Sequence, residues 1–433
     1  QVTASAMSSV MARGIARALA IDVRELPAVA SGFALFFLLF CGYYVLRPVR
    51  ETMGVAGGVD NLPWLFTATF VVTLAAQPLF GWVVARVQRH LILPVVFGFF
   101  AGNLLVFVAA MVAAPDNLWL ARSFYVWLSV FNLIAVSVAW SVLVDVFDTT
   151  QAQRLFGVSA AGASLGGLVG PALAVMLVGP WGHAGLLALS ACLLLAAAAA
   201  AALVRRQAGA MTSADDAARQ PLGGSPLAGM RDVLHSPYLL RIALFMALLA
   251  CVSTFLYVEQ ARIVAMSFPD RAAQTRVFGT LDAIVQGLSI GLQLFVTGRI
   301  ARRQFGIGVL LVAVPMVTML GFLWLALAPG FAALAVVMVL RRAGEYGLVR
   351  PGREMLYSVM SATAKYRAKN FNDTVVYRGA DALAGWLKAM LDAVAQLPAV
   401  AMLAGAVLAL AWAVTGGSLA RRQRGLARTD HEE

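Results

Sequence analysis

Charged residues are scarce in this 433-residue chain, in which only 12% of the residues are Asp, Glu, Lys or Arg. A soluble domain carries about a quarter of such residues. By contrast, 61% of this chain is hydrophobic, and the apolar residues form repeated long runs. A run of about 20 apolar residues is long enough to cross a bilayer as a helix. The composition excludes an ordinary soluble fold and predicts an all-α polytopic membrane protein.

Cysteine and histidine are also rare, and their positions exclude several kinds of site. The three cysteines, Cys41, Cys192 and Cys251, lie inside apolar runs without the spacing of a disulfide framework or a metal site. The four histidines lie near loops or in the tail, so none offers a buried proton relay. No Walker, HExxH or CxxC motif is present. We therefore expect no cofactor, no metal and no catalytic residues.

The apolar runs predict twelve transmembrane helices in two pseudo-repeated halves of six. The expected spans are residues 27–47, 62–85, 91–114, 118–145, 155–178, 183–204, 238–258, 277–298, 306–328, 331–349, 371–395 and 397–416. A polar stretch rich in Ala, Gly, Ser and Pro is typical of a linker between the halves. The expected organisation is a segment at 1–26, a half at 27–204, a linker at 205–237, a half at 238–416 and a tail at 417–433.

Basic residues fall in alternate loops, the pattern that sets orientation in a membrane. They cluster before span 1, after spans 2 and 8, in the linker, in the loop from Arg341 to Lys369 and in the tail. Both termini are therefore expected to be cytoplasmic. Topology also explains the net charge of +12 without nucleic acid as a partner. An excess of Arg and Ala favours a bacterial gene, and so a multi-pass protein in the lipid bilayer of the inner membrane.

A glycine motif after span 2 resembles a known transporter signature. Gly81, Arg86 and Arg89 follow the loop 2–3 signature of the major facilitator superfamily, Gly-x-x-x-Asp-Arg-x-Gly-Arg-Arg. The acid of that signature is Ala85 in this chain. A similar glycine followed by basic residues, beginning at Gly298, closes span 8. The resemblance implies two repeated halves with the binding site at their interface.

Span 5 carries a second glycine motif. Its pattern is made by Gly157, Gly166, Gly170 and Pro171. This resembles the span 5 signature of antiporters in the same superfamily, although the closing Gly-Gly is absent. Spacing alone favours a simpler role, because Gly162, Gly166 and Gly170 form a seam of small residues that lets another helix pack closely.

Span 11 has the densest group of charges. Its charged face is made by Arg378, Asp381, Gly385, Lys388 and Asp392, which recur at spacings of three and four residues. Charged side chains inside a membrane face protein or water and are functional by default. We expect Arg378 and Lys388 to bind an anion and Asp381 to act as a coupling or gating acid. The alternative is a set of structural pairs, Arg378 with Asp381 and Lys388 with Asp392.

Span 8 carries a weaker polar face. Its members are Asp282, Gln286, Ser289 and Gln293. Interhelical hydrogen bonds would explain the amides. We expect Asp282 to be functional, either as a proton carrier or as the partner of a cation in span 11. Glu259, at the end of span 7, is expected to be a gating acid.

The end of span 1 combines an aromatic ring with two guanidinium groups. Tyr43, Arg47 and Arg50 share one helical face. Arginine binds phosphate or carboxylate through two parallel hydrogen bonds, and a tyrosine ring can stack on a base. Anchoring at the membrane interface is the alternative. Substrate binding is favoured because these arginines lie on the side where basic residues are otherwise scarce.

The region 350–381 resembles a known family. Its motifs are Pro-x-Arg-Glu-Met-x-Tyr from 351, Lys-Tyr-Arg-Ala-Lys from 365 and Asp-x-Val-Val-x-Arg-Gly from 373. Together with Leu-Arg-Pro-Val-Arg-Glu from 46, they resemble the plastid and intracellular-bacterial ATP/ADP translocases, and most closely the branch of free-living bacteria. The resemblance implies twelve helices, nucleotide antiport and phosphate-binding cations in helices 1 and 11.

The resemblance also assigns individual positions. Arg50 stands where the family has a lysine in helix 1, Glu354 where it has an acid, and Lys369 where it has the lysine before helix 11. Glu354 is therefore expected to be a coupling or gating acid. The family continues after Arg378 with Gly-Lys-Ser-Gly character, whereas this chain has Asp381. An acid in that place argues against ATP as the solute.

These observations predict a secondary active transporter for a small anionic solute, nucleotide-like or phosphorylated, that works by alternating access through antiport or proton coupling. One alternative is transport of another amphipathic or anionic metabolite such as a siderophore, and another is a non-transporting receptor or scaffold. An enzyme is disfavoured because no catalytic constellation is visible. We expect the protein to act as a monomer.

Overall fold

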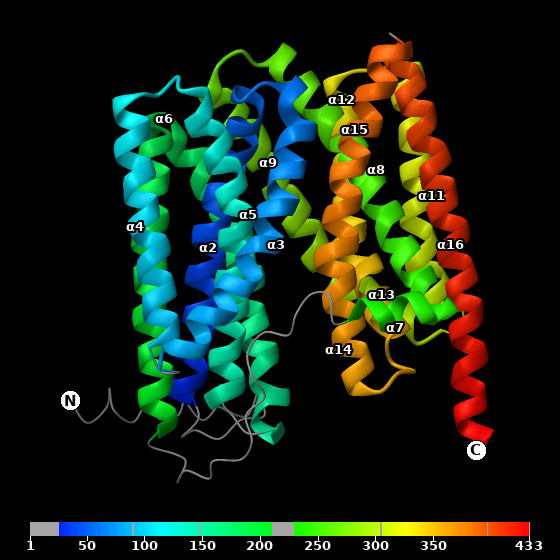
Figure 1. The fold of residues 1–433 in the computed structure, drawn as a ribbon, viewed down its shortest axis with the longest axis horizontal. Coiled ribbons are helices and arrows are strands. Elements are labelled where there is room, and N and C mark those ends of the chain that lie inside the picture. Colours follow the sequence, from blue (N-terminus) through cyan, green and yellow to red (C-terminus); the bar gives the residue numbers. More distant parts are fainter. Residues whose placement is uncertain are drawn as a thin grey trace, which may run out of the picture. The chain divides into compact units, whose positions relative to one another are not determined.

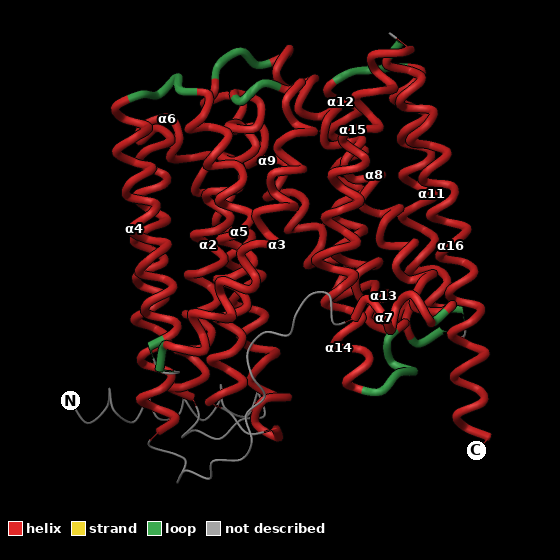
Figure 2. Tube along the Cα trace, viewed as in Figure 1, coloured by secondary structure: helices red, strands yellow, loops and turns green. Residues whose placement is uncertain are grey.

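The computed structural model describes residues 26–88, 91–146, 149–209, 229–303, 305–395 and 397–432. These residues form helices joined by short loops and include no strand (Figures 1 and 2). The expected N-terminal segment and residues 210–228 of the expected linker lie outside the described part, as does Arg89.

The first half of the chain contains five long helices and one short 3-10 turn. They are α2 (Leu26–Ala56), η1 (Val59–Asn61), α3 (Leu62–Arg86), α4 (Ile92–Ala113), α5 (Leu118–Val146) and α6 (Thr149–Gly209). The helix α6 is bent at Gly182, whose φ of 63° lies in the left-handed region that glycine adopts without strain. The bend divides α6 into two helices that match the spans expected at 155–178 and 183–204.

In the second half, three helices contain a π-helical turn. The elements are α7 (Met230–His235), α8 (Pro237–Ser267), α9 (Arg271–Leu292), η3 (Gln293–Thr297), α10 (Gly298–Ala301), α11 (Gly306–Leu327), α12 (Phe331–Gly344), η4 (Glu345–Val349), α13 (Arg350–Leu356), α14 (Ala362–Phe371), η5 (Asn372–Val376), α15 (Tyr377–Ala395) and α16 (Pro398–Glu432). The π-helical turns are η3, η4 and η5. Such turns are rare and frequently occur at functional sites.

Each of the twelve predicted spans coincides with a helix. Among the described residues, nine helical segments are long and apolar enough to cross a membrane, and the bent α6 is one of them. The helices α12 and α15 are not among the nine, because α12 is short and α15 carries four charged residues. Large apolar side chains point outward, and Leu383 of α15 is 73% exposed. The predicted all-α polytopic membrane fold is confirmed.

Internal contacts divide the chain into two compact units. The first comprises residues 1–48, 81–116 and 131–222, and the second comprises 49–80, 117–130 and 223–433. The ends of α2, α3 and α5 therefore group with the C-terminal helices. The expected division into halves at 27–204 and 238–416 stays a prediction.

In the first unit, α2 packs closely on α6 through the glycine seam. A Cβ atom added to Gly162 would lie 2.5 Å from the Phe33 carbonyl oxygen, and one added to Gly166 would lie 2.4 Å from that of Phe37. At Gly170 the corresponding distance to the Cys41 carbonyl oxygen is 2.6 Å. No side chain fits between the two backbones at these positions, so the seam has the packing role that its spacing predicts.

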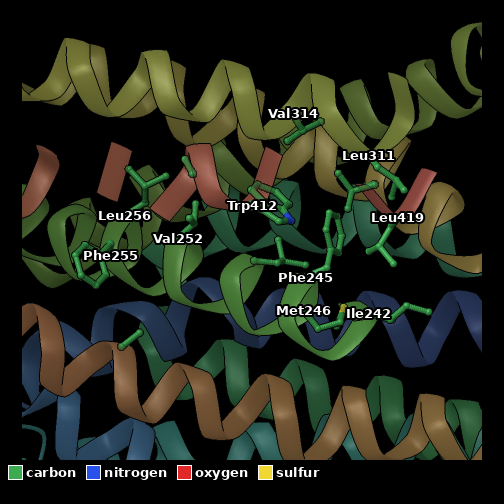
Figure 3. Close-up of a cluster of buried hydrophobic side chains, with 14 of the residues drawn as sticks. Ile242, Phe245, Met246, Val252, Phe255, Leu256, Leu311, Val314, Trp412 and Leu419 are labelled. Atoms are coloured by element: carbon green, nitrogen blue, oxygen red, sulfur yellow. The ribbon is translucent and has the colours of Figure 1, made fainter. Parts of the chain in front are cut away.

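The second unit has an apolar core among α8, α11 and α16. Phe245 of α8 contacts Trp412 of α16, with ring centroids 5.6 Å apart and planes inclined at 51°. Leu311 of α11 and Leu419 of α16 are fully buried in the same cluster (Figure 3). The long helices α11 and α16 lie side by side along this core (Figure 1). This apolar packing holds α8, which contributes Thr254 to the site described below.

The glycine seam allows a stability prediction. Replacing Gly166 by alanine should lower the free energy of unfolding by about 1–3 kcal/mol, because overpacking forces the backbones of α2 and α6 apart. Thermal unfolding of the purified protein in detergent measures the effect. Gly98→Ala is the matched control, since a Cβ there meets nothing within 4 Å and alanine favours the helix. Equal effects of the two substitutions would contradict the packing role.

Candidate functional site

The second unit gathers charged side chains from four helices into what we call the central cluster. Its members are Arg50 and Glu51 of α2, Thr254 of α8, Arg341 and Glu345 of α12 and η4, and Arg378 and Asp381 of α15. Arg50 of α2 and Arg378 of α15, both predicted from the sequence to bind the solute, thus lie in one compact unit, whereas Tyr43 and Arg47 belong to the first unit.

The helices α8 and α15 run side by side and hold Asp381 between them. The Thr254 hydroxyl donates a hydrogen bond of 2.8 Å to the Asp381 carboxylate. One turn away, Cys251 Sγ lies 4.0 Å from the Ala380 carbonyl oxygen. The opposite face of α15 is apolar and exposed, with Leu383 and Met390 on it. The charged face of α15 is therefore turned toward protein, as an intramembrane charge requires.

Asp381 interacts with several other charged residues of the central cluster. Its carboxylate lies 3.8 Å from the Arg378 guanidinium and interacts electrostatically with Arg50 and Glu345. A distance of 3.8 Å is longer than a hydrogen bond. Among the described residues, the guanidinium of Arg378 makes no hydrogen bond, and its side chain is 29% exposed. Arg378 therefore keeps its donors available for an anion.

Arg50 is held against α5. Its Nε atom donates to the Tyr125 carbonyl oxygen at 3.2 Å, and its guanidinium lies over the Tyr125 ring at 3.9 Å from the centroid. The neighbouring Glu51 accepts a hydrogen bond of 3.1 Å from Arg50. Gly54 makes room for these rings, because a Cβ there would lie 2.9 Å from the Tyr125 ring and 3.4 Å from the Tyr257 hydroxyl.

Arg341 and Arg342 are expected from the sequence to lie in a basic loop, but they are buried within a helix. They belong to α12, which continues through η4 and α13 as one helical rod, and they are only 5% and 7% exposed. Arg341 contacts Glu345 at 3.0 Å and the Ser253 hydroxyl at 2.7 Å. Burial is tolerated because each guanidinium faces an acid. The sequence contains a signal for this burial, because both arginines lie inside the expected span 331–349.

Asp282 pairs with a different helix from the one expected. Its carboxylate lies 2.6 Å from Arg342 of α12, with side-chain exposures of 3% and 9%. Adjacent residues of a helix point about 100° apart. Arg341 and Arg342 therefore reach in different directions, one toward Ser253 of α8 and the other toward Asp282 of α9.

The π-helical turns lie next to these charges. Glu345 opens η4, and η5 ends one residue before α15 begins. Thr297 in η3 donates a hydrogen bond of 2.6 Å to the Gly347 carbonyl oxygen in η4. A Cβ added to Gly347 would lie 2.7 Å from Leu292 Cβ, so glycine lets the two turns approach. The widened turns thus set the direction of Glu345.

A second group, the lysine cluster, comprises Glu259, Arg262, Lys388 and Asp392. Lys388 Nζ lies 2.5 Å from Asp392 and 3.6 Å from Glu259, and Glu259 also pairs with Arg262. The side chain of Lys388 is fully buried. The pairs Arg378–Asp381 and Lys388–Asp392, expected as a structural alternative, are thus both present. Lys388 is enclosed by two carboxylates, whereas Arg378 is partly exposed.

A third group, the hinge cluster, comprises Arg353, Glu354, Lys369 and Asp373. Lys369 Nζ lies 2.7 Å from Glu354, and Arg353 lies 3.0 Å from Asp373. The side chains of Glu354 and Lys369 are about two-fifths exposed, at 42% and 38%. The acid and the lysine carried over from the translocase resemblance are therefore paired with each other, outside the central cluster.

The remaining expected residues lie in the first unit. Tyr43 packs edge-on against Tyr44 with centroids 5.1 Å apart, and the guanidinium of Arg47 lies 5.7 Å from the Tyr44 ring centroid. Arg86 lies over Trp82 at 4.1 Å. Added Cβ atoms at Gly81 and Gly157 would meet nothing within 4 Å, and Pro171 lies inside α6 next to the seam.

Ion pairs join basic residues of the second unit to acids. Six basic residues, Arg50, Arg262, Arg341, Arg342, Arg378 and Lys388, pair with six acids, Glu51, Glu259, Asp282, Glu345, Asp381 and Asp392. Such pairs must offset a desolvation penalty of several kcal/mol per ion. In the described part of the chain, no group of His, Cys, Asp and Glu could hold a metal ion. The chemistry that the arrangement offers is exchange of ionic partners.

Comparison with known proteins decides the family. The model of the Major Facilitator Superfamily matches residues 32–367, which is more than three quarters of the chain. The chain belongs to the Major Facilitator Superfamily. It is thus a multi-pass membrane protein of a transporter family and not an enzyme, as the sequence predicts.

Individual relatives are more distant. ADP,ATP carrier protein 1 of Chlamydia muridarum is 23% identical over 430 residues, covering 83% of this chain and 80% of the relative. The protein of the same name from Chlamydia pneumoniae is 21% identical, with 83% of each chain covered. The crystal structure of the POT family transporter PepTSo has a TM-score of 0.66 at 14% identity, covering 92% of this chain and 98% of that one. These findings agree with the translocase resemblance of region 350–381.

The buried pairing predicts a large energetic coupling between Arg342 and Asp282. Removing either charge should lower the free energy of unfolding by about 3–5 kcal/mol, because the remaining ion is buried without its partner. The double variant R342M/D282N should recover part of that loss. Denaturation of the four proteins in detergent measures the coupling.

The exposed pair Lys369–Glu354 provides the matched control. Its double-mutant cycle should give about 1 kcal/mol or less, since exposed ion pairs contribute little. Equal coupling in the two cycles would show that Arg342 and Asp282 do not form a buried pair.

Proposed function

We propose that this protein is a secondary active transporter that moves a small anionic solute, and that the central cluster binds it. The observation that carries the proposal is Arg378, whose guanidinium is partly exposed, makes no hydrogen bond within the described part of the chain and lies beside Asp381 at 3.8 Å. Such a group can bind a carboxylate or phosphate through two parallel hydrogen bonds. An intramembrane cation of this kind marks a solute pathway.

The central cluster can bind a solute by exchanging one ionic partner of Arg378 for another. A solute anion that reaches Arg378 replaces Asp381 as its partner, and Asp381 then keeps its hydrogen bond from Thr254 and its electrostatic interaction with Arg50. The loss of one ion pair is offset by another, so the change requires little energy. The hydroxyl of Thr254 keeps the released carboxylate solvated. The two six-helix halves expected from the sequence would alternate around this site.

The other acids take supporting roles. Asp282 holds Arg342, Glu259 holds Lys388 with Arg262, and Glu354 holds Lys369. We assign Glu259 and Glu354 to gating, because each joins segments that are separate in the chain. Asp282 and Asp381 are assigned to coupling. That Tyr43 and Arg47 of α2 bind the solute stays a prediction from the sequence.

The class of solute follows from charge and from relatives. The relatives named ADP,ATP carriers support a nucleotide-like or phosphorylated anion, moved by exchange or with protons. Transport of another amphipathic or anionic metabolite, such as a siderophore, is the second candidate, because the guanidinium of Arg378 suits a carboxylate equally well. We further propose a monomer in a bacterial inner membrane with both termini cytoplasmic, supported by the distribution of basic loops.

Counterflow in proteoliposomes tests the transport function. Vesicles loaded with an unlabelled candidate anion should accumulate the same labelled anion without an energy source, as expected of an exchanger. Chemical conversion of the anion would indicate an enzyme. Absence of both flux and conversion across phosphorylated metabolites, nucleotides and carboxylates would favour a receptor or scaffold.

Arg378→Ala should reduce counterflow to the background of empty vesicles, because the substitution removes the accessible guanidinium. The amount of protein inserted in the membrane should stay unchanged, since Asp381 keeps its hydrogen bond from Thr254 when Arg378 is removed. Arg421→Ala is the matched control, because Arg421 is exposed on α16. Wild-type counterflow in the Arg378 variant would remove the central cluster as the binding site.

A further inference from the structure

We propose that Asp381 limits the charge of the solute, so that the protein selects a solute with a single anionic charge over polyanions; the proposal rests on the transport function given above. The group recognised is a carboxylate or a singly ionised phosphoryl group. Asp381 is thus a specificity-determining residue as well as a partner of Arg378.

Charge balance is the first step. The three cations of the central cluster, Arg50, Arg341 and Arg378, are matched by its three acids, Glu51, Glu345 and Asp381, so the cluster itself carries no net charge for a solute to balance. A polyanion would bring several uncompensated charges into a region where isolated charges are strongly disfavoured. A single anionic group requires the release of only one carboxylate. The weakest pair, Arg378–Asp381, supplies that exchange.

The position of the acids is the second step. Two acids of the central cluster are partly exposed, Glu51 at 11% and Asp381 at 14%. Asp381 also interacts electrostatically with Glu345, a further acid of the central cluster. Any further phosphate attached to a solute held by Arg378 would approach carboxylates of like charge. Like charges at close distance are repulsive, and more so where water is excluded.

The burial of the other cations is the third step. Lys388 is fully enclosed between Glu259 and Asp392, and Arg341 is 5% exposed between Glu345 and Ser253. Neither can be reached by a solute without rearrangement of the helices. The cations that could otherwise balance a polyphosphate are thereby committed to acids of the protein.

A charge ladder tests this selectivity on the purified full-length protein. Cyclic AMP, AMP, ADP and ATP share adenosine and carry successively more negative charge, and lactate, succinate and citrate form a second series without a base. Binding of each is measured by calorimetry or by the shift in unfolding temperature. Affinity should fall with charge within whichever series binds. Affinity that is constant or rises with charge would overturn the limit on charge while leaving anion transport in place.

The same measurements distinguish a failure of the proposed transport function from a failure of the charge limit. If no member of either series binds or exchanges, the anion-transport function falls, and the charge limit falls with it. Binding of ATP or citrate in preference to the singly charged members would overturn the charge limit and leave anion transport in place. The wild-type protein alone gives these outcomes, so the test does not depend on the folding of a variant.

Substitution of Asp381 tests whether this residue causes the selectivity for solute charge. Asp381→Asn should improve binding of the doubly charged member relative to the singly charged one by about tenfold or more, the effect of removing one charge at an effective dielectric constant of about 20. Asp381→Glu should keep the wild-type order, because the charge remains. Asp60→Asn removes an exposed acid of the same unit and should also keep that order. An unchanged order in the Asp381→Asn protein would assign the selectivity elsewhere.

Discussion

The contact on which the account depends is that of Asp381 with Arg378. A charge inside a membrane protein persists only when it is paired and hydrogen-bonded, because desolvation costs several kcal/mol per ion. Most cations of this region meet that condition through close contacts, such as the 2.6 Å pair of Arg342 with Asp282. Arg378 meets it only through a separation of 3.8 Å. A loosely held ion inside an otherwise tightly paired network is the place where a solute can enter.

The surrounding fold makes such a loose contact possible. The helices α8 and α15 run side by side, so that Thr254 supports Asp381 with a hydrogen bond. The π-helical turn η4 directs Glu345 toward Arg341, and Gly347 lets that turn approach Leu292. Apolar packing of α8 against α11 and α16 holds these elements in place. The polar network is therefore supported by a conventional hydrophobic core.

Much of this arrangement could be predicted from sequence, because hydropathy and helical periodicity are local properties. The spans, the seam at Gly166 and the charged face of α15 follow from spacing alone. The cross-helix partners do not, since pairing depends on which helices become neighbours. The pair of Asp282 with Arg342 of α12 is an example of a contact that spacing does not predict. Arg341 is expected in a loop because basic residues near the end of a span usually indicate the cytoplasmic side of the membrane.

The most direct measurement is an experimentally determined structure of the protein with a transported anion bound. The account predicts that the anionic group lies within hydrogen-bonding distance of the Arg378 guanidinium, with Asp381 moved away from Arg378 and still bonded to Thr254. An anion bound instead to Arg353 and Lys369 of the hinge cluster, with the Arg378–Asp381 contact unchanged, would contradict it.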